Sequence, residues 1–291
     1  MDSKEKNKKE LTRRDFLKIS GGVVGLAIMS TPIIETYRRF RQVTSKQKTA
    51  NKTSRQWCMV IDLSKCEGCV TIGQPPQCTQ ACIKMHFVPN GQKWIEVYKI
   101  ILLGGGSYYM PTPCFQCENA PCVKVCPVKA TYHNEEGIVL IDHTRCIGCR
   151  LCMAACPYQR RFFNWGTPSL APEAFFAQYS PEFPVPAKRG TVIKCMFCAH
   201  LLKAGKLPGC VAGCPMKALY MGDFNSNMAS NGVEIVQLSK FLDENSAYRY
   251  KEELGTQPRV WYLPGHGQSF GRNSKDIREL KPSVWLGSED K

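Results

Sequence analysis

The sequence lacks repeated runs of about 20 apolar residues, which excludes a multi-spanning membrane protein. Histidine is scarce, and the five residues His86, His133, His143, His200 and His266 show no metal-ligand spacing with one another. No side chains form a recognisable catalytic dyad or triad, and no nucleic-acid-binding motif is present. The chain therefore shows no active site of its own.

Cysteine is abundant instead. The chain has 291 residues, of which 43% are hydrophobic and 22% charged, an ordinary globular composition for one large domain or two intimate ones. Its 17 cysteines are far above the usual content. Such enrichment has two usual causes, a disulfide scaffold or a set of metal sites, and the spacing of the cysteines decides between them.

Sixteen of the cysteines fall into four groups of four. The first group is Cys66, Cys69, Cys78 and Cys82; the second is Cys114, Cys117, Cys122 and Cys126; the third is Cys146, Cys149, Cys152 and Cys156; the fourth is Cys195, Cys198, Cys210 and Cys214. The third group has the Cys-x2-Cys-x2-Cys-x3-Cys-Pro spacing of bacterial ferredoxins. Proline follows the last cysteine in every group but the first, where Ile83 stands instead.

This spacing indicates ligation of 4Fe-4S clusters. A tight Cys-x2-Cys loop aims its thiolates inward, and in two-cluster ferredoxins the fourth cysteine ligates the partner cluster. Zinc ribbons use paired Cys-x2-Cys but need no four-cysteine run, and eight disulfides are unnecessary in a chain with enough core. Both remain alternatives. Cys78, which follows an eight-residue insertion, is the least secure ligand, and we expect the seventeenth cysteine, Cys58, to be a buried structural thiol.

The formal net charge of +15 does not indicate a nucleic-acid-binding protein. Residues 1–55 carry 14 Lys and Arg against 5 Asp and Glu, so most of the excess is local. Four oxidised clusters with their thiolates would contribute roughly −8. The metallated domain would then be close to neutral.

The N-terminus resembles a twin-arginine export signal. Arg13 and Arg14 lie in the motif TRRDFLK at residues 12–18, and an apolar stretch follows at residues 19–34. This route exports folded proteins and suits cofactors inserted in the cytoplasm. There is no clear cleavage site, and the stretch is shorter than the roughly 20 residues that span a bilayer, so cleavage and retention as an anchor both remain open. Residues 42–56 are polar and predict a flexible linker.

Residues 57–263 resemble the four-cluster iron-sulfur subunits of complex iron-sulfur molybdoenzymes, such as polysulfide, dimethyl sulfoxide and tetrathionate reductases. The resemblance rests on residues 59–62 (MVID), 113–122 (PCFQCENAPC), 146–152 (CIGCRLC), 247–249 (AYR) and 253–256 (ELGT). It implies an α+β fold of tandem ferredoxin-like modules, each with two 4Fe-4S clusters, with pseudo-two-fold pairing and irregular insertions.

The resemblance also implies that paired groups exchange their last cysteines. The four ligand sets are then Cys66, Cys69, Cys78 and Cys214; Cys195, Cys198, Cys210 and Cys82; Cys114, Cys117, Cys122 and Cys156; and Cys146, Cys149, Cys152 and Cys126. Because no ligand is replaced, four 4Fe-4S clusters are expected. In this family the first and fourth groups lie beside the catalytic subunit and the other pair towards the membrane subunit.

We expect four segments along the chain: a signal or anchor over residues 1–41, the linker, a four-cluster domain over 57–225, and an extension over 226–291 that packs on the core or on a partner. Within them the pattern predicts a strand over 59–63, two strands around residues 104–106, a strand over 139–142, an irregular excursion over 164–190 and a helix over 236–243. The basic side chains Arg160, Arg161 and Lys194 are expected to be solvated; the alternatives are that they raise cluster potentials or contact a quinol-binding subunit.

The sequence thus predicts an exported subunit, periplasmic or on the outer face of the cytoplasmic membrane, that relays electrons through four 4Fe-4S clusters. Its expected partners are a catalytic subunit, molybdenum or tungsten in type, and a quinone-linked membrane subunit or a cytochrome. Two alternatives stay open: a free-standing exported polyferredoxin, and an iron-sulfur subunit of a hydrogenase or cytochrome complex.

Overall fold

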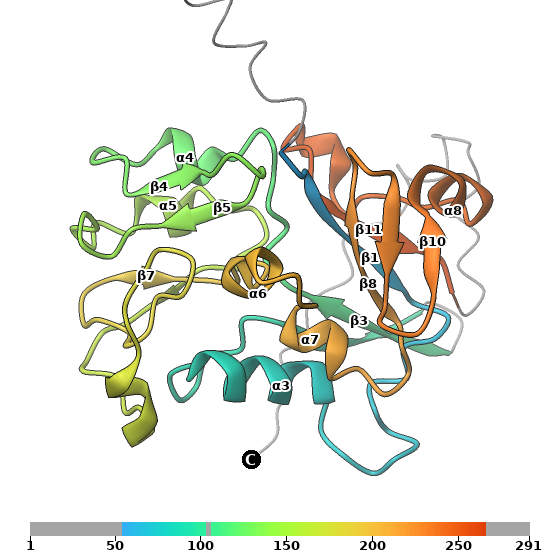
Figure 1. Cartoon of the computed structure of the whole chain (residues 1–291), viewed down its shortest axis with the longest axis horizontal. Coiled ribbons are helices and arrows are strands. Elements are labelled where there is room, and N and C mark those ends of the chain that lie inside the picture. Colours follow the sequence, from blue (N-terminus) through green and yellow to red (C-terminus); the bar gives the residue numbers. More distant parts are fainter. Residues whose placement is uncertain (1–53, 103–105, 266–291) are drawn as a thin grey trace, which may run out of the picture. The chain divides into compact units, whose positions relative to one another are not determined.

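The computed structural model describes residues 54–102 and 106–265 of the chain. The largest sheet of these residues has five strands in the order β10-β9-β8-β1-β11 and lies on the right in Figure 1. Its strands are β1 (Trp57–Asp62), β8 (Leu219–Asp223), β9 (Met228–Ser230), β10 (Ile235–Gln237) and β11 (Val260–Leu263). Strand β1 pairs antiparallel with β8 and parallel with β11, so the two ends of the described chain meet in one sheet.

Both faces of β1 are buried, which explains its apolar sequence, WCMVID. Met59 and Ile61 belong to the large hydrophobic core, whereas Cys58 and Val60 belong to a smaller core on the other face, following the two-residue period of a strand. The predicted strand is confirmed, although it begins at Trp57. Cys58 is fully buried, as predicted, and burial raises the pKa of its thiol.

Three two-stranded antiparallel sheets complete the strands of the described residues. They are β2 (Glu96–Ile101) with β3 (Ser107–Thr112), β4 (Thr131–His133) with β5 (Val139–Ile141), and β6 (Phe162–Phe163) with β7 (Val192–Ile193). The predicted strands on either side of the glycine run and the predicted strand before the third cysteine group are confirmed. Strands β1, β3, β5 and β7 each end shortly before the first cysteine of a group.

The helices are short, and most of them carry cysteines. They are α3 (Gln77–His86), α4 (Pro121–Lys124), α5 (Leu151–Ala154), α6 (Ala199–Lys203), α7 (Gly209–Ala212) and α8 (Leu238–Glu244), with the 3₁₀ helices η1 (Pro172–Phe176) and η2 (Glu252–Leu254). Helix α3 packs against α7, and α4 against α5 (Figure 1). A Cβ on Gly213, at the end of α7, would lie 2.6 Å from the Cβ of Ala81. The helix of Cys78 and Cys82 can therefore approach the helix of Cys210 closely.

The remaining secondary-structure predictions hold with one shift. Helix α8 begins two residues later than predicted, because Val236 pairs with Ala229 in the β10–β9 ladder. The excursion over residues 164–190 has little regular structure beyond η1, as its five prolines predict. The mixture of small sheets and short helices is the predicted α+β class.

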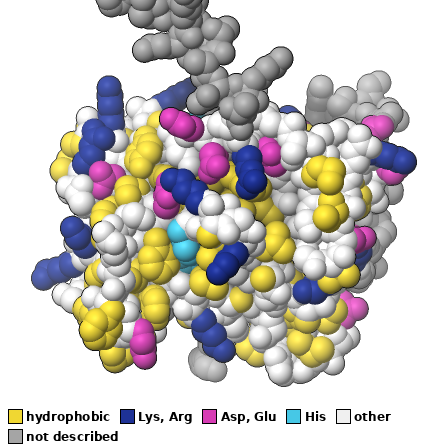
Figure 2. All heavy atoms as spheres, viewed as in Figure 1, with side chains coloured by type: hydrophobic (Ala, Val, Ile, Leu, Met, Phe, Trp, Pro, Cys, Tyr) yellow, Lys and Arg dark blue, Asp and Glu magenta, His cyan; other side chains and the backbone are white. Residues whose placement is uncertain are grey.

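Residues on both sides of the predicted boundary at 225 belong to the same sheet, because β8 pairs with β9. The predicted signal and most of the predicted linker lie outside the described residues. Within residues 54–102 and 106–265, no helix has the length and apolar character needed to cross a membrane. On the face shown in Figure 2, basic and acidic side chains are interspersed and form no continuous basic stripe.

Candidate metal centres

The seventeen cysteines all lie in the described part of the chain, and all are free thiols. The described part of the chain contains no group of three His, Cys, Asp or Glu side chains close enough to hold one metal ion. These observations give no support to the disulfide and single-zinc alternatives. The ligands of a four-iron cluster surround a larger volume than the ligands of one ion.

The four Cys-x2-Cys loops share one backbone turn. The residue before the second cysteine has a positive φ in each loop: +62° at Gly68, +47° at Gln116, +70° at Gly148 and +51° at Phe197. A left-handed residue at this point reverses the chain within the loop. Two of these four positions are not glycine, so the sequence alone gives no signal for the turn there.

A second kind of turn follows the last cysteine of the second, third and fourth groups. The backbone N–H groups of Lys129, Gln159 and Lys217 donate to the carbonyls of Cys126, Cys156 and Cys214 at 3.2, 3.2 and 3.3 Å. These three donor residues have φ of +51°, +53° and +51°. The first group has no such proline turn, because Cys82 lies inside α3. The presence or absence of proline in the sequence therefore distinguishes two local structures.

Cys214, from the fourth group, lies beside the first group. Burial raises the pKa of the Cys66 thiol to about 11, and the neighbouring thiols of Cys214 and Cys69 add to the rise. Burial raises the pKa of Cys78 to about 12, again with contributions from Cys214, Cys66 and Cys69. The structure thus brings together the four cysteines of the first exchanged set.

Cys82, from the first group, lies in turn beside the fourth group. Burial raises the pKa of Cys82 well above its usual value, and the thiols of Cys195 and Cys198 contribute next. Burial also raises the pKa of Cys210, with contributions from Cys198, Cys195 and Cys82. The second exchanged set is therefore also assembled.

The structure also places Cys156 beside the second group and Cys126 beside the third. Burial raises the pKa of Cys117 to about 12, and the thiols of Cys114, Cys122 and Cys156 contribute. The other set is visible as a cavity, because one hollow of the surface is lined by all four of its thiols. They are Cys126, Cys146, Cys149 and Cys152.

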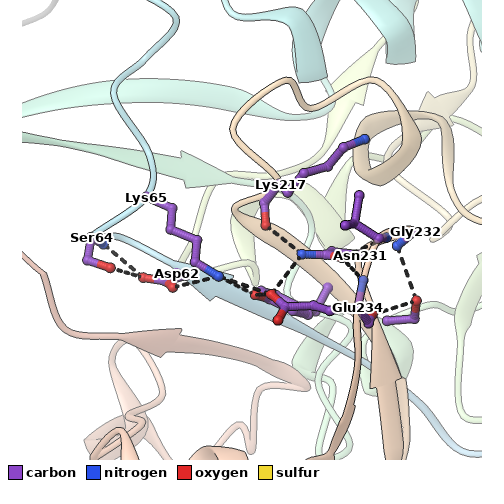
Figure 3. A network of polar contacts seen from close by, with 10 residues as sticks. Asp62, Ser64, Lys65, Lys217, Asn231, Gly232 and Glu234 are labelled. Carbon is purple, nitrogen blue, oxygen red and sulfur yellow. Dashed lines mark hydrogen bonds and ion pairs between the residues drawn. The ribbon is translucent and has the colours of Figure 1, made fainter.

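A polar network connects the two segments that bring Cys66 and Cys214 together (Figure 3). Lys65, next to Cys66, donates to the hydroxyl of Tyr220 at 2.5 Å and to Glu234 Oε1 at 3.1 Å. Asn231 Nδ2 donates to the same Glu234 oxygen at 3.2 Å and to the carbonyl of Lys217 at 3.0 Å. The β9–β10 turn thereby links the entrance of the first loop to the turn after Cys214.

The donor set fits a 4Fe-4S cluster. The backbone N–H of Gln77 donates to Cys69 Sγ at 3.4 Å, and backbone N–H groups of Gly68 and Gly209 oppose the effect of burial on the pKa of Cys66 and Cys198. Such bonds stabilise thiolates. Four buried thiolates in one place repel one another, and iron supplies the positive charge that compensates them. Four cysteine thiols per set match the ligand requirement of the cluster.

The expectation that the three basic side chains are solvated is wrong. Exposed fractions are 7% for Arg160, 4% for Arg161 and 2% for Lys194. Arg160 pairs with Glu96 at 3.3 Å, whereas Lys194 donates to the carbonyls of Val139 and Cys195 and to Gln116. Sequence spacing shows where a charge is but not which groups surround it, and these side chains turn inward towards thiols and carbonyls.

Sequence reasoning assigned no role to His86, the last residue of α3. Its Nε2 lies 3.0 Å from Cys198 Sγ, and its side chain is 2% exposed. Burial, with the neighbouring His200, lowers the pKa of His86 to about 3, so the ring is neutral. A thiolate only accepts hydrogen bonds, so a ligating Cys198 requires the proton on Nε2. The sequence feature that could have indicated this contact is the position of His86 four residues after Cys82, on the same face of helix α3.

Comparison with known proteins agrees with this geometry. The family model of a 4Fe-4S dicluster domain matches residues 106–171, which contain the second and third groups. The B subunit of the selenate reductase of Mesobacillus selenatarsenatis is 35% identical over 309 aligned positions, covering 90% of this chain and 100% of that protein. The B subunit of the tetrathionate reductase of Salmonella typhimurium is 31% identical, covering 87% and 88% of the two proteins. The B polypeptide of the polysulfide reductase of Wolinella succinogenes is 34% identical, covering 72% and 95%.

The chain is a member of the family of reductase iron-sulfur subunits. It is an electron-transfer subunit that carries 4Fe-4S clusters, and its second and third groups form a ferredoxin-like dicluster domain. The resemblance stated from the sequence is confirmed.

Gly148, in the Cys-x2-Cys loop of the third group, has no room for a side chain. A Cβ there would lie 2.3 Å from the carbonyl oxygen of Gly190, and its φ of +70° already strains any other residue. We expect Gly148→Ala to distort the loop and lower the iron content by up to about four atoms per chain. Elemental analysis checks this.

Gly205→Ala is the matched control, because Gly205 has a φ of +69° and nothing lies within 4 Å of the position that the new methyl group would take. It should cost only the left-handed strain of about 1–2 kcal/mol and keep all its iron. Equal iron content in the two variants would contradict the close approach at Gly148.

Proposed function

We propose that this subunit holds four 4Fe-4S clusters and passes single electrons between a catalytic subunit and a membrane or cytochrome partner. The observation that carries the proposal is the assembly of four cysteine sets, each with three thiols from one group and one from its paired group. The proposed ligands are Cys66, Cys69, Cys78 and Cys214; Cys195, Cys198, Cys210 and Cys82; Cys114, Cys117, Cys122 and Cys156; and Cys146, Cys149, Cys152 and Cys126.

The contacts between sets support a single linear path. The first two sets share α3, which carries both Cys78 and Cys82. The fourth group then adjoins the second, because the backbone N–H of Cys114 hydrogen-bonds the thiol of Cys195. The α4–α5 pair connects the second group to the third. When bound, each cluster accepts and releases one electron, and the protein contributes ligands, N–H···S bonds and a largely buried environment.

The set of Cys126, Cys146, Cys149 and Cys152 is the natural end of this path. Cys149 is the one exposed cysteine of the seventeen. Beside it, Ile147 and Leu151 are 64% and 50% exposed, which provides apolar surface next to the thiols. We assign this end to the quinone-linked membrane subunit or cytochrome, and the end formed by Cys66, Cys69, Cys78 and Cys214 to the catalytic subunit.

The proposed catalytic partner is a molybdenum or tungsten enzyme. Support comes from the names of the relatives, which are subunits of selenate, tetrathionate and polysulfide reductases. A further relative is the iron-sulfur cluster-binding subunit of a menaquinone reductase, 38% identical over 72% of this chain, which supports a quinone link. We further propose export through Arg13 and Arg14, with residues 1–41 as signal or anchor and 42–56 as linker.

Metal analysis of the anaerobically purified native complex tests the proposal. We expect about 16 iron atoms per chain, with stoichiometric molybdenum or tungsten from a co-purifying catalytic subunit. About eight iron atoms would contradict the four-cluster arrangement. Full iron without molybdenum, tungsten or a partner favours the free-standing polyferredoxin, and nickel favours a hydrogenase.

A further inference from the structure

We infer that the charge of Arg161 sets together the reduction potentials of the second and third clusters, meaning the clusters held mainly by the second and third cysteine groups. The inference rests on the proposed four-cluster function and goes beyond it. Arg161 is not a ligand. Its guanidinium supplies a buried positive charge to two clusters that share it.

Arg161 lacks an ordinary counter-ion. Its side chain is 4% exposed, and no carboxylate of the described residues lies within 4 Å of its nitrogens. Nη1 donates to Thr131 Oγ1 at 3.3 Å, while the buried Nη2 has no oxygen or nitrogen partner among the described residues. A buried charge without compensation is strongly unfavourable. The compensating charge must therefore come from something else near the guanidinium.

The groups near Arg161 are thiols from both proposed cluster sites. Burial lowers the pKa of Arg161, but the thiols of Cys122, Cys152, Cys114 and Cys156 outweigh this effect and raise it. Cys114, Cys122 and Cys156 belong to the set that holds the second group's cluster, and Cys152 belongs to the set that holds the third group's cluster. Thr131, which accepts the hydrogen bond from Arg161 Nη1, also lines the cavity of Cys126, Cys146, Cys149 and Cys152.

The position of Arg161 follows from the repeated turn. Arg161 is the fifth residue after Cys156, and Thr131 is the fifth residue after Cys126. The hydrogen bond between Arg161 Nη1 and Thr131 Oγ1 therefore joins equivalent positions in the turns that follow Cys126 and Cys156. This places the guanidinium between the two sites.

The expected consequence is electrostatic. Reduction of a cluster adds one electron and therefore one negative charge, and a fixed cation nearby favours that reduced form in a poorly solvated site. Arg161 thus raises both potentials and favours residence of the electron on the second and third clusters. The thiols that affect Arg161 most strongly all belong to the second and third groups.

Arg160 provides a matched control. It is the adjacent residue and is similarly buried, at 7% exposed. Its charge is already paired, since Nη1 lies 3.3 Å from Glu96 Oε2 and Nη2 donates to the Tyr98 hydroxyl at 2.7 Å. Loss of its charge should leave the cluster potentials unchanged.

The test is a potentiometric titration of the anaerobically purified complex followed by EPR, combined with iron analysis. Arg161→Gln should lower the midpoint potentials of the second and third clusters and leave the other two unchanged. Arg161→Lys, which keeps the charge, should stay close to wild type, and Arg160→Gln should shift none of the four. Unchanged potentials in an iron-replete Arg161→Gln complex, or the same shift in Arg160→Gln, would overturn the inference.

Loss of iron from Arg161→Gln is also informative. Full iron in Arg161→Lys would then support charge compensation, whereas loss of iron in both variants would show that the shape of the side chain matters rather than its charge, and would overturn the inference. A wild-type complex with fewer than four clusters would instead contradict the proposed function, so the two failures are distinguishable.

Discussion

Cys126→Ser should remove the cluster of the third group and leave that of the second group, to which Cys126 belongs in the sequence. The reason is the exchange of last cysteines, since Cys126 lines a cavity with Cys146, Cys149 and Cys152. Serine is a much weaker iron ligand than cysteine, so iron should fall by up to about four of about 16 atoms per chain. EPR of the reduced complex distinguishes the two signals.

Two variants complete this experiment. Cys156→Ser should have the reciprocal effect, because Cys156 lies beside Cys117 and Cys122. Cys58→Ala is the control for loss of a buried thiol outside the four sets, and it should retain all iron because Cys58 lies in the smaller hydrophobic core. Loss of the second group's signal from Cys126→Ser, with the third group's signal intact, is incompatible with the exchange.

The local structure around the cysteines could be predicted from the sequence because it depends on neighbouring residues. The proline after Cys126, Cys156 and Cys214 marks one repeated turn, and its absence after Cys82 marks the helix that replaces it. The glycine run at 104–106 marked the pairing of β2 with β3 in the same way. In each case a residue with restricted or unusual backbone freedom acts within a few positions of itself.

The long-range arrangement could not be predicted in this way. Strand β11 pairs with β1 across almost the whole described chain, and nothing in the sequence VWYL specifies that partner. The left-handed turns at Gln116 and Phe197 lack the glycine that would have indicated them. The burial of Lys194 depends on acceptors at Gln116 and Val139, both distant in the sequence, besides the carbonyl of the adjacent Cys195, so its charge alone suggested a solvated residue.

Lys194→Met should destabilise the protein by about 3 kcal/mol, because it removes the ammonium group from the junction between the fourth and second groups. Lys194 Nζ donates to the carbonyl of Cys195 at 2.8 Å, to Gln116 Oε1 at 3.5 Å and to the carbonyl of Val139. Each buried acceptor left unpaired costs about 1–3 kcal/mol, and methionine keeps the volume without the donors. Gln116 Oε1 retains the bond from the Val139 N–H at 2.9 Å, so the full sum is not expected.

For a domain of this size, that loss corresponds to a decrease in Tm of roughly 6–12 °C, measurable by anaerobic thermal denaturation of the iron-replete complex. Lys203→Met is the control, because the Lys203 side chain is 54% exposed and its ion pair with Glu182 lies at the surface. Such a pair contributes about 1 kcal/mol or less. Equal Tm values for the two variants would mean that the buried ammonium does not hold the junction. A selective fall for Lys194→Met would show that a cation in this family can connect the two cluster pairs mechanically, a role separate from the electrostatic one inferred for Arg161.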